Sequence, residues 1–301
     1  MEECNAVIFD IKRFAIHDGD GIRTTIFFKG CPLRCMWCHN PEGISFAPEI
    51  QFVAGKCFGC RECERQCENR VHIFDRENHV LNRDKCVSCG KCMENCPSNA
   101  LILSGKKMSL SEVFQIAMED VKFYQQSGGG VTLSGGECLC QADFCTELLR
   151  LLKAQNINTA VDTSGYVSRT ALDQVIPYTD MFLYDIKHID IDKHKLYTGV
   201  TNERILDNLS YLNNKGKKVE IRIPIIPTVN DDERTIQQIG KLLSNYEVIQ
   251  NVRILAYNNL AGSKYEMIGK ENKMPKVEPP SEEHMIGISK ILQSYGLNVV
   301  M

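Results

Sequence analysis

Three cysteines lie close together in the stretch KGCPLRCMWCHNPEG, at Cys31, Cys35 and Cys38. Thiolates are the usual protein ligands of iron–sulfur clusters, and they also bind zinc. Most sites of both kinds take four protein ligands, and the fourth candidate in this stretch is His39. Because His39 directly follows Cys38, the two side chains are poorly placed to reach one metal ion. We therefore expect a 4Fe–4S cluster with one iron that lacks a protein ligand, with a three-thiolate zinc site that includes His39 as the alternative.

An iron without a protein ligand can bind a small molecule, as the open position of a catalytic metal site does. Residues that could contact such a molecule follow several predicted strands, and glycines among them allow close backbone approach. These candidates are Gly135, Gly136, Glu137, Asp162, Asp185, Lys187 and Arg222. Each alone could be a turn residue or a buried charge. Because barrel enzymes build their sites at the carboxyl ends of parallel strands, their shared position favours one common site.

Eight further cysteines form two runs with the spacing C-x2-C-x2-C-x3-C. This is the spacing of ferredoxins with two 4Fe–4S clusters, in which the fourth cysteine of each run ligates the other cluster. The pattern predicts one cluster on Cys57, Cys60, Cys63 and Cys96, and another on Cys86, Cys89, Cys92 and Cys67. A pair of four-cysteine zinc sites is the alternative. Pro97 follows the second run as in ferredoxins, whereas Glu68 follows the first.

Strand-like and helix-like segments alternate along most of the chain. The expected strands are 23–29, 131–134, 157–161, 180–185, 218–226 and 252–256, and the expected helices are 109–126, 143–155, 169–176, 201–214, 232–245 and 281–295. Such alternation indicates an α/β fold with a parallel sheet. Six units are too few for a closed eightfold barrel, so we expect an open or partial one. Residues 49–103 interrupt the alternation, and we interpret them as a small inserted α+β domain within a barrel of residues 1–48 and 104–301.

Composition excludes several classes of protein. The net charge of −3 and the isoelectric point of about 6.2 provide no basic field for nucleic acid. No apolar run reaches the roughly 18 residues that a membrane span requires, and acidic residues stand where a signal peptide needs positive charge. We therefore expect a cytoplasmic protein whose clustered cysteines bind metal rather than form disulfides. The remaining cysteines are expected to be small buried or incidental residues; they are Cys4, Cys138, Cys140 and Cys145.

Five motifs, in order, resemble those of glycyl-radical-enzyme activating enzymes, the pyruvate formate-lyase activating enzyme family of the radical S-adenosylmethionine (SAM) superfamily. They are HDGDGIRTTIFFKGCPLRCMWCHNPEG, SGGGVTLSGGE, DTSGYV, DIKHID and LYTGVTNERIL. The two-cluster insert is typical of a longer subgroup. The resemblance implies a partial (β/α)6 radical-SAM barrel with a ferredoxin-like insert. It also implies an oxidoreductase that reductively cleaves S-adenosylmethionine to methionine and a 5′-deoxyadenosyl radical, which abstracts hydrogen from a backbone glycine of a partner enzyme.

The resemblance also assigns roles to single residues. Cys31, Cys35 and Cys38 would hold the catalytic cluster. The expected SAM contacts include several of the strand-end candidates. They are Trp37, Cys38, His39, Gly135, Gly136, Glu137, Asp185, Ile186, Lys187, Arg222 and Asn258. A site for Na⁺ or K⁺ would use Asp162, Thr163 and Asp185, and Asp18 and Arg23 would contact the partner. Two positions depart from the family: Asp20 stands where proline is usual, and Asn258 where histidine is frequent.

The expected partners are a large glycyl radical enzyme, bound through its C-terminal glycine loop, and a flavodoxin or ferredoxin electron donor. We expect the chain itself to be a monomer. The insert is interpreted either as an electron wire or as a docking platform. Two alternatives for the whole protein are a radical SAM enzyme acting on another peptide or a small molecule, and a polyferredoxin that only carries electrons.

Overall fold

A computed structural model describes residues 4–76 and 78–301. Its main feature is a nine-stranded sheet of order β13-β12-β11-β10-β9-β8-β2-β1-β7. The six expected strands are neighbours in the middle of this sheet, and every pair of neighbours among them is parallel. They are β2 (Arg23–Phe28), β8 (Gly130–Gly135), β9 (Asn158–Thr163), β10 (Met181–Asp185), β11 (Val219–Ile225) and β12 (Ile249–Ala256). The prediction of an α/β fold with a parallel-rich sheet is confirmed.

Three strands extend the sheet beyond the prediction. At one edge β13 (Val299–Val300) continues parallel to β12. At the other, β1 (Asn5–Ala15) pairs antiparallel with both β2 and β7 (Lys106–Ser109). The charged residues Asp10 and Lys12 lie in β1, which has an exposed stretch near the edge of the sheet. Within the described residues, β13 and β7 are the two edges, so the sheet is open.

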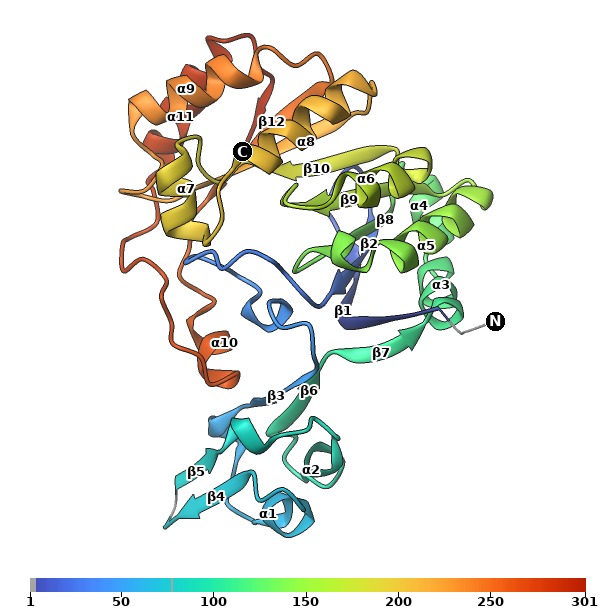
Figure 1. Ribbon diagram of the computed structural model, residues 1–301, viewed down its shortest axis with the longest axis vertical. Helices are drawn as coiled ribbons and strands as arrows, with labels where there is room; N and C mark the ends of the chain where they lie inside the picture. Colours follow the sequence, from blue (N-terminus) through green and yellow to red (C-terminus); the bar gives the residue numbers. More distant parts are fainter. Residues whose placement is uncertain (1–3, 77) are drawn as a thin grey trace.

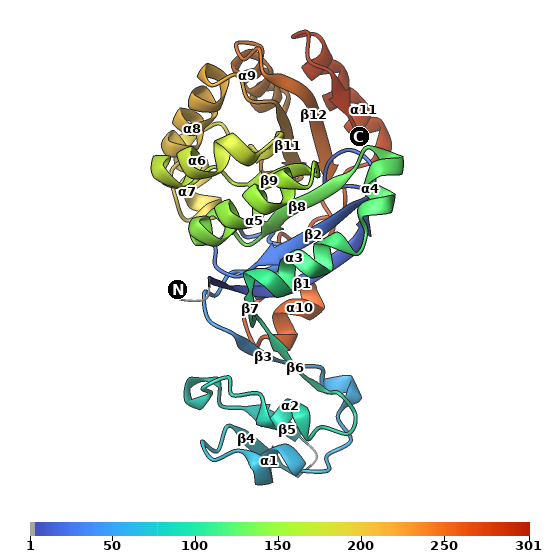
Figure 2. The same cartoon turned by 90° about the vertical axis from the view of Figure 1, so that its right-hand side faces the viewer.

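Helices flank the sheet, as Figures 1 and 2 show. Those expected from the sequence are α3 (Leu110–Met118), α4 (Val121–Ser127), α5 (Ala142–Ala154), α6 (Arg169–Val175), α8 (Glu203–Asn214), α9 (Glu233–Leu243) and α11 (Glu282–Gln293). Their apolar faces and the sheet form one large core that includes Leu148, Ile221 and Ile239. None of the helices in the described ranges combines the length and apolar character needed to cross a membrane.

The helix expected over 109–126 is divided into α3 and α4. The expected capping box is present, since Ser109 accepts a hydrogen bond from the Glu112 amide and the Glu112 carboxylate accepts one from the Ser109 amide. The break comes at Asp120, whose buried carboxylate pairs with Arg13 of β1 and accepts a hydrogen bond from Thr24 of β2 at 2.8 Å. Tertiary contacts to two strands therefore override the local helical pattern. The sequence analysis did not anticipate α7 (Ile191–Thr198), which is capped by Asp190.

Residues 49–104 project from the barrel sheet (Figure 1). Two antiparallel pairs give this segment its order: β3 (Glu49–Phe52) with β6 (Leu101–Ser104), and β4 (His72–Asp75) with β5 (Asn78–Leu81). Two short helices, α1 (Glu62–Gln66) and α2 (Lys91–Glu94), carry cysteines of the two runs. The segment is tied to the rest of the chain by Arg83, which donates to the main-chain oxygen of Met267 in α10 (Gly262–Met267) at 2.7 Å.

Candidate functional site

A cavity of about 360 Å³ lies at the carboxyl ends of the parallel strands. Its volume is in the range of small-molecule sites. Most of the predicted site residues line it together: Asp18, Cys31, Cys35, Trp37, Cys38, His39, Gly135, Gly136, Asp162, Asp185, Lys187 and Arg222. Residues from four strands and from the cysteine loop thus meet at one place, as their strand-end positions predicted.

Main-chain hydrogen bonds hold the cysteine loop in position. The Gly30 amide donates to the Gly43 oxygen at 2.8 Å, and the Cys31 amide to the Ile44 oxygen at 3.1 Å. From the other side, the amides of Arg34 and Met36 donate to the main-chain oxygens of Thr198 and Tyr197. These bonds leave the cysteine side chains free to bind a metal cluster. Trp37 both lines the cavity and packs against buried residues such as Ile226 and Tyr257.

The short helix α10 clamps the end of the loop. Lys264 donates through Nζ to the His39 oxygen at 3.0 Å, to Asn40 Oδ1 at 3.0 Å and to Glu42 Oε1 at 2.8 Å. Tyr265 donates its hydroxyl to the Cys38 oxygen at 3.1 Å. Sequence reasoning missed both residues, because they lie more than 200 positions from the loop and in no recognisable motif.

The surroundings of the three thiols favour a cluster over a single zinc ion. The Nε2 atom of His39 lies 3.0 Å from the main-chain oxygen of Asn258, so this ring nitrogen already has a partner. Zinc–sulfur bonds of about 2.3 Å place the sulfurs around one ion about 4 Å apart. Among the described residues, the group that meets such spacing is Cys63, His72 and His79, and it does not include the loop.

Burial makes these thiols poor thiolates unless a cation binds them. It raises the pKa of Cys35 to about 12, against the opposing effect of the Lys187 ammonium. The pKa values of Cys31 and Cys38 are raised for the same reason. Buried thiols become thiolates when a metal replaces the proton, so their burial fits a metal-binding role better than a role as free nucleophiles.

A buried charge network connects the ends of β9, β10 and β11. Arg222 lies 3.6 Å from Asp162, 3.7 Å from Asp18 and 3.5 Å from Glu220. Lys187 lies 2.8 Å from Asp185. Burial would lower the pKa of both basic groups, but the neighbouring acids raise it, so both stay protonated. Burial raises the pKa of Asp162 to about 6, although Arg222 opposes the shift.

The Gly135–Gly136–Glu137 turn packs directly on the cysteine loop. The Gly136 amide donates to the Phe28 oxygen at 2.8 Å and the Glu137 amide to the Gly30 oxygen at 2.7 Å. A Cβ at Gly136 would lie 2.4 Å from the Gly43 oxygen, and Gly135 has a φ of +119°, so both positions require glycine. The two glycines thus bring the β8 backbone to the cavity wall.

The side chain of Glu137 does not line the cavity. It is fully buried and accepts hydrogen bonds from Thr163 Oγ1 at 2.8 Å, the Ser164 amide at 2.9 Å and Ser164 Oγ at 2.6 Å. Burial raises the pKa of Glu137, while the bonds from Ser164 and Thr163 oppose the shift. The hydrogen bond from Thr163 to Glu137 therefore joins the end of β9 to the turn after β8. The Thr163 hydroxyl is occupied by this hydrogen bond.

Three other predicted contacts lie outside the cavity wall. Ile186 is buried, and Asn258 offers its main-chain oxygen to His39 while its side chain accepts a bond from the Leu260 amide. Arg23 is wholly buried, and burial lowers its pKa to about 10. Its guanidinium donates to Thr132 Oγ1 at 2.6 Å and to the Val131 oxygen at 2.8 Å. The expectation that Arg23 touches a partner is wrong, because its charge is used inside the fold.

The cavity has further lining residues that the sequence analysis did not name. They are Phe27, Leu33, Asn40, Ile44, Ser134, Ser164, Pro224, Ile226, Leu255, Ala256 and Tyr257. Ser134 and Ser164 flank motifs that were recognised, and their positions at strand ends were the available signal. Ser134 donates to Asp162 at 2.6 Å, so it supports one of the predicted residues.

The eight cysteines of the projecting segment gather around two smaller cavities. One is lined by Cys57, Cys60, Cys63 and Cys96, and the other by Cys67, Cys86, Cys89 and Cys92. Each set combines three cysteines of one run with the last cysteine of the other. This is the division that the ferredoxin spacing predicts.

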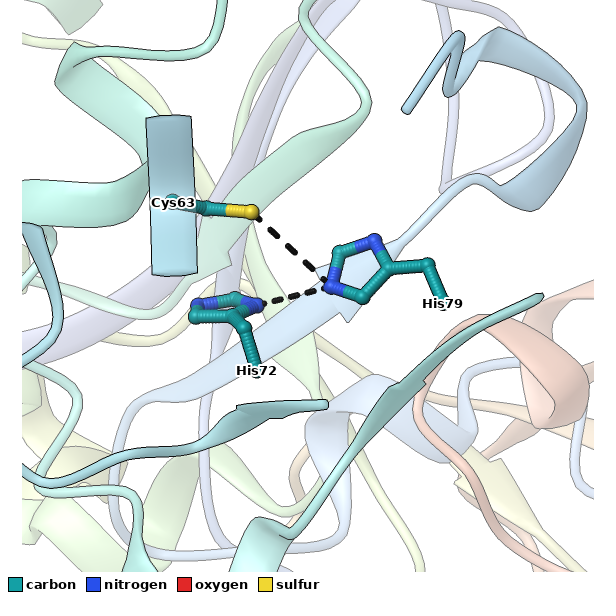
Figure 3. A group of neighbouring side chains, drawn as sticks. All are labelled: Cys63, His72 and His79. Atoms are coloured by element: carbon teal, nitrogen blue, oxygen red, sulfur yellow. Dashed lines mark hydrogen bonds between the residues drawn. The ribbon is translucent and has the colours of Figure 1, made fainter. Parts of the chain in front are cut away.

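Two histidines lie beside the first set of cysteines (Figure 3). His79 Nε2 is 2.9 Å from His72 Nδ1 and 3.9 Å from Cys63 Sγ, and His79 Nδ1 is 3.5 Å from Cys57 Sγ. Burial lowers the pKa of both imidazoles, that of His72 to about 4. No sequence motif indicated this pair.

Comparisons with known proteins agree with this geometry. Residues 25–239 match the family model of the radical SAM superfamily. The isethionate sulfite-lyase activating enzyme of Oleidesulfovibrio alaskensis is 38% identical, over 92% of this chain and 91% of that protein. The trans-4-hydroxy-L-proline dehydratase activating enzyme of Clostridioides difficile is 37% identical, over 98% of both chains.

A solved structure gives the same result. A domain of pyruvate-formate lyase-activating enzyme from Bacteroides vulgatus superposes with a TM-score of 0.50 at 30% identity, covering 57% of this chain and 98% of that one.

Replacing Lys264 with Met should loosen the cysteine loop. The change removes the cation that faces the buried Glu42 carboxylate, and we expect a loss of about 1–3 kcal/mol in the free energy of unfolding. Anaerobic urea unfolding and iron retention at the loop measure the effect. The exposed Lys241→Met is the matched control, and adding Glu42→Gln to Lys264→Met should recover part of the loss. A Lys264→Met protein as stable as wild type, with full iron, would contradict the clamp.

Proposed function

The chain belongs to the radical SAM superfamily and, within it, to the activating enzymes of glycyl radical enzymes. From this premise we propose a role for each of its site residues. Such an enzyme uses a 4Fe–4S cluster and S-adenosylmethionine, and it acts on a glycyl radical enzyme. The proposal concerns the residues that hold each group, the number of clusters, and the path of the electron.

Cys31, Cys35 and Cys38 hold the catalytic 4Fe–4S cluster, and S-adenosylmethionine completes it at the fourth iron. One observation carries this assignment: three half-buried cysteines line one cavity, and among the described residues no fourth cysteine lines it. When bound, the cluster and S-adenosylmethionine supply the reductive cleavage that yields methionine and a 5′-deoxyadenosyl radical, which takes hydrogen from a glycine of the partner. The donor set fits the group, because thiolates are its usual ligands.

Other residues orient S-adenosylmethionine. Lys187 and Arg222 supply positive charge for its carboxylate, and their acidic neighbours keep them protonated inside the fold. Gly135 and Gly136 offer backbone without side chains, so that its methionine part can approach closely. Trp37 and Tyr257 give the cavity apolar surface. Glu137 acts as a positioning residue, since its carboxylate fixes Ser164, which lines the cavity.

The proposed chemistry predicts that Cys35→Ala abolishes formation of 5′-deoxyadenosine. The measurement is anaerobic: reconstitution with iron and sulfide, reduction, addition of S-adenosylmethionine and quantification of the product. We expect about twelve irons per wild-type chain and about eight in the variant, as three and two cubane clusters require. The matched control is Cys140→Ala, which changes an exposed cysteine that does not line the cavity and should leave the product unchanged.

Two outcomes of this assay would contradict the assignment. Wild-type protein with three intact clusters but no product would favour an electron carrier. Product at the wild-type level in Cys35→Ala would show that the loop does not hold the catalytic cluster.

A monovalent cation, Na⁺ or K⁺, binds between Asp162 and Asp185 at the cavity wall. Both carboxylates lie there at neighbouring strand ends, and a cation offsets their mutual repulsion. Thr163, the third predicted ligand, does not line the cavity, and its hydroxyl donates to Glu137, so the two carboxylates carry the proposed site.

The cation predicts a pH-dependent stabilisation. Because burial raises the pKa of Asp162 to about 6, the carboxyl is ionised at pH 7.5 and protonated at pH 5. Replacing choline chloride by KCl or NaCl should therefore raise the melting temperature at pH 7.5, and this gain should be lost as the pH falls through 6. Asp162→Asn should abolish the gain, and the exposed Asp192→Asn should keep it. An equal melting temperature in all three salts at pH 7.5 would contradict the site.

Residues 49–103 form a ferredoxin-like domain that holds two further 4Fe–4S clusters and conducts electrons to the catalytic one. The support is the division of the eight cysteines around two cavities in the interleaved arrangement. A flavodoxin or ferredoxin would donate to this domain, and the C-terminal glycine loop of the glycyl radical enzyme would reach the barrel cavity near Asp18.

If the insert conducts electrons, Cys60→Ala and Cys89→Ala should each lose product formation with a protein donor but not with a small-molecule reductant. With a flavodoxin as donor, we expect 5′-deoxyadenosine formation to fall at least tenfold, because the path is interrupted. With dithionite, which reduces the catalytic cluster directly, product should remain. If flavodoxin still supports cleavage while only activation of the partner is lost, the insert is a docking platform and the electron-wire proposal fails.

A further inference from the structure

We propose that His79 donates a hydrogen bond to the Cys57 thiolate, and that this bond gives the cluster on Cys57, Cys60, Cys63 and Cys96 a higher reduction potential than its neighbour in the insert. The inference rests on the proposed two-cluster domain. It adds that the two clusters are unequal, and that one side chain accounts for a defined part of the difference.

The proposal takes His72 as the donor within the histidine pair. His72 Nδ1 lies 2.9 Å from His79 Nε2, and His79 Nδ1 lies 3.5 Å from Cys57 Sγ (Figure 3 shows the pair beside Cys63). When His72 donates to Nε2, the neutral ring of His79 carries its own hydrogen on Nδ1, which faces the sulfur. His72 is therefore a positioning residue that acts through His79.

Aromatic packing holds the His79 ring in this orientation. Phe74, its cross-strand partner in the β4–β5 pair, stacks on it with centroids 4.2 Å apart and planes at 11°. Phe52 of β3 meets it edge-on at 4.5 Å. Because the ring is packed on two sides, its N–H stays directed at one acceptor. A constant effect on the reduction potential of the cluster requires such a fixed orientation.

Among the described residues, no side chain at the second cluster site corresponds to His79. The donors there are the main-chain amides of Ser88 to Cys86 Sγ and Val71 to Cys67 Sγ, both at 3.4 Å, and the first site has such an amide too, from Ala100 to Cys96 Sγ at 3.3 Å. The two cysteine runs are repeats, and counting seven residues back from the first cysteine of each leads to Ile50 before Cys57 and to His79 before Cys86. Ile50 lines the second cavity, as His79 lines the first. His72 also borders the second cavity, but in the part of the chain that the structure describes its ring makes no hydrogen bond to those cysteines. The repeat therefore places an apolar side chain where its counterpart has an N–H group.

Hydrogen bonds to cluster sulfurs raise the reduction potential, because they stabilise the additional negative charge of the reduced state. The affected cluster lies at the outer end of the insert. In Figures 1 and 2, α1, which carries Cys63, lies farther from the barrel sheet than α2, which carries Cys92. The second run is also anchored inward, since Ser88 donates to the Pro48 oxygen at 2.8 Å. The proposed hydrogen bond would therefore act on the cluster site that lies farther from the barrel sheet.

The test is a redox titration of the full chain followed by electron paramagnetic resonance. The background is Cys31→Ala/Cys35→Ala/Cys38→Ala, so that only the insert clusters contribute. In His79→Phe, which keeps an aromatic ring but has no N–H, we expect one of the two midpoints to become more negative. The ratio of reduced to oxidised cluster at a fixed potential should fall several-fold, and the other midpoint should stay unchanged.

Two further variants separate the hydrogen bond from the shape of the ring. His79→Asn places an amide nitrogen near the position of Nδ1 and should restore the midpoint. His72→Phe leaves the Nδ1 proton of His79 unfixed and should shift the same midpoint in the same direction, but less.

Each outcome bears on a separate claim. If the background protein holds fewer than about eight irons, the two-cluster domain fails, whatever His79 does. If both clusters are present and His79→Phe leaves both midpoints unchanged, the role of His79 is overturned. If the His79→Phe protein does not retain the cluster, the His72→Phe protein provides the test instead. An unchanged midpoint potential of that cluster in His72→Phe would overturn the proposal. One zinc per chain that disappears in His79→Phe would assign Cys63, His72 and His79 to a zinc ion and would also overturn it.

Discussion

The cysteine loop must be positioned without the side chains that do its chemistry. In the proposed function Cys31, Cys35 and Cys38 bind metal, so the loop depends on main-chain hydrogen bonds and on backbone contacts close enough to exclude any side chain. The Gly30–Gly43 bond and the contact of Gly136 with the Gly43 oxygen meet this requirement. The turn after β8 and the loop after β2 therefore form one unit. Lys264 holds the end of the loop through its hydrogen bond to the His39 oxygen.

Charge imposes the second requirement. A cavity that binds a zwitterionic molecule must keep acids and bases side by side in a buried place, where each alone would lose its charge. Arg222 stays protonated because Asp162, Asp185 and Asp18 surround it, and Lys187 because Asp185 is adjacent. These groups come from the ends of neighbouring parallel strands, so the register of the sheet is what brings them together.

Much of this arrangement could be predicted from local patterns. The six parallel strands are short apolar runs between helical segments, and the cysteine spacing anticipates how the two runs divide around two cavities. What was missed depends on contacts distant in sequence. β1 carries charges along an exposed stretch, so its pattern did not resemble a buried strand. Arg23 was expected to contact the partner because the HDGDGIR motif resembles a family loop near the partner's glycine loop, yet Thr132 and Val131 satisfy it inside the fold. The inward orientation of Glu137 likewise depends on Thr163 and Ser164, which no motif links to it.

The central claim is that the loop cluster has one iron reserved for S-adenosylmethionine. The most direct test is electron–nuclear double resonance on the reduced protein, with S-adenosylmethionine labelled isotopically at the amine nitrogen of its methionine part. The account predicts a hyperfine coupling between that nitrogen and the cluster spin, present in wild type and absent in Cys38→Ala. Fully reduced clusters with S-adenosylmethionine bound but no coupling would contradict it, because the cofactor would then lie away from the iron.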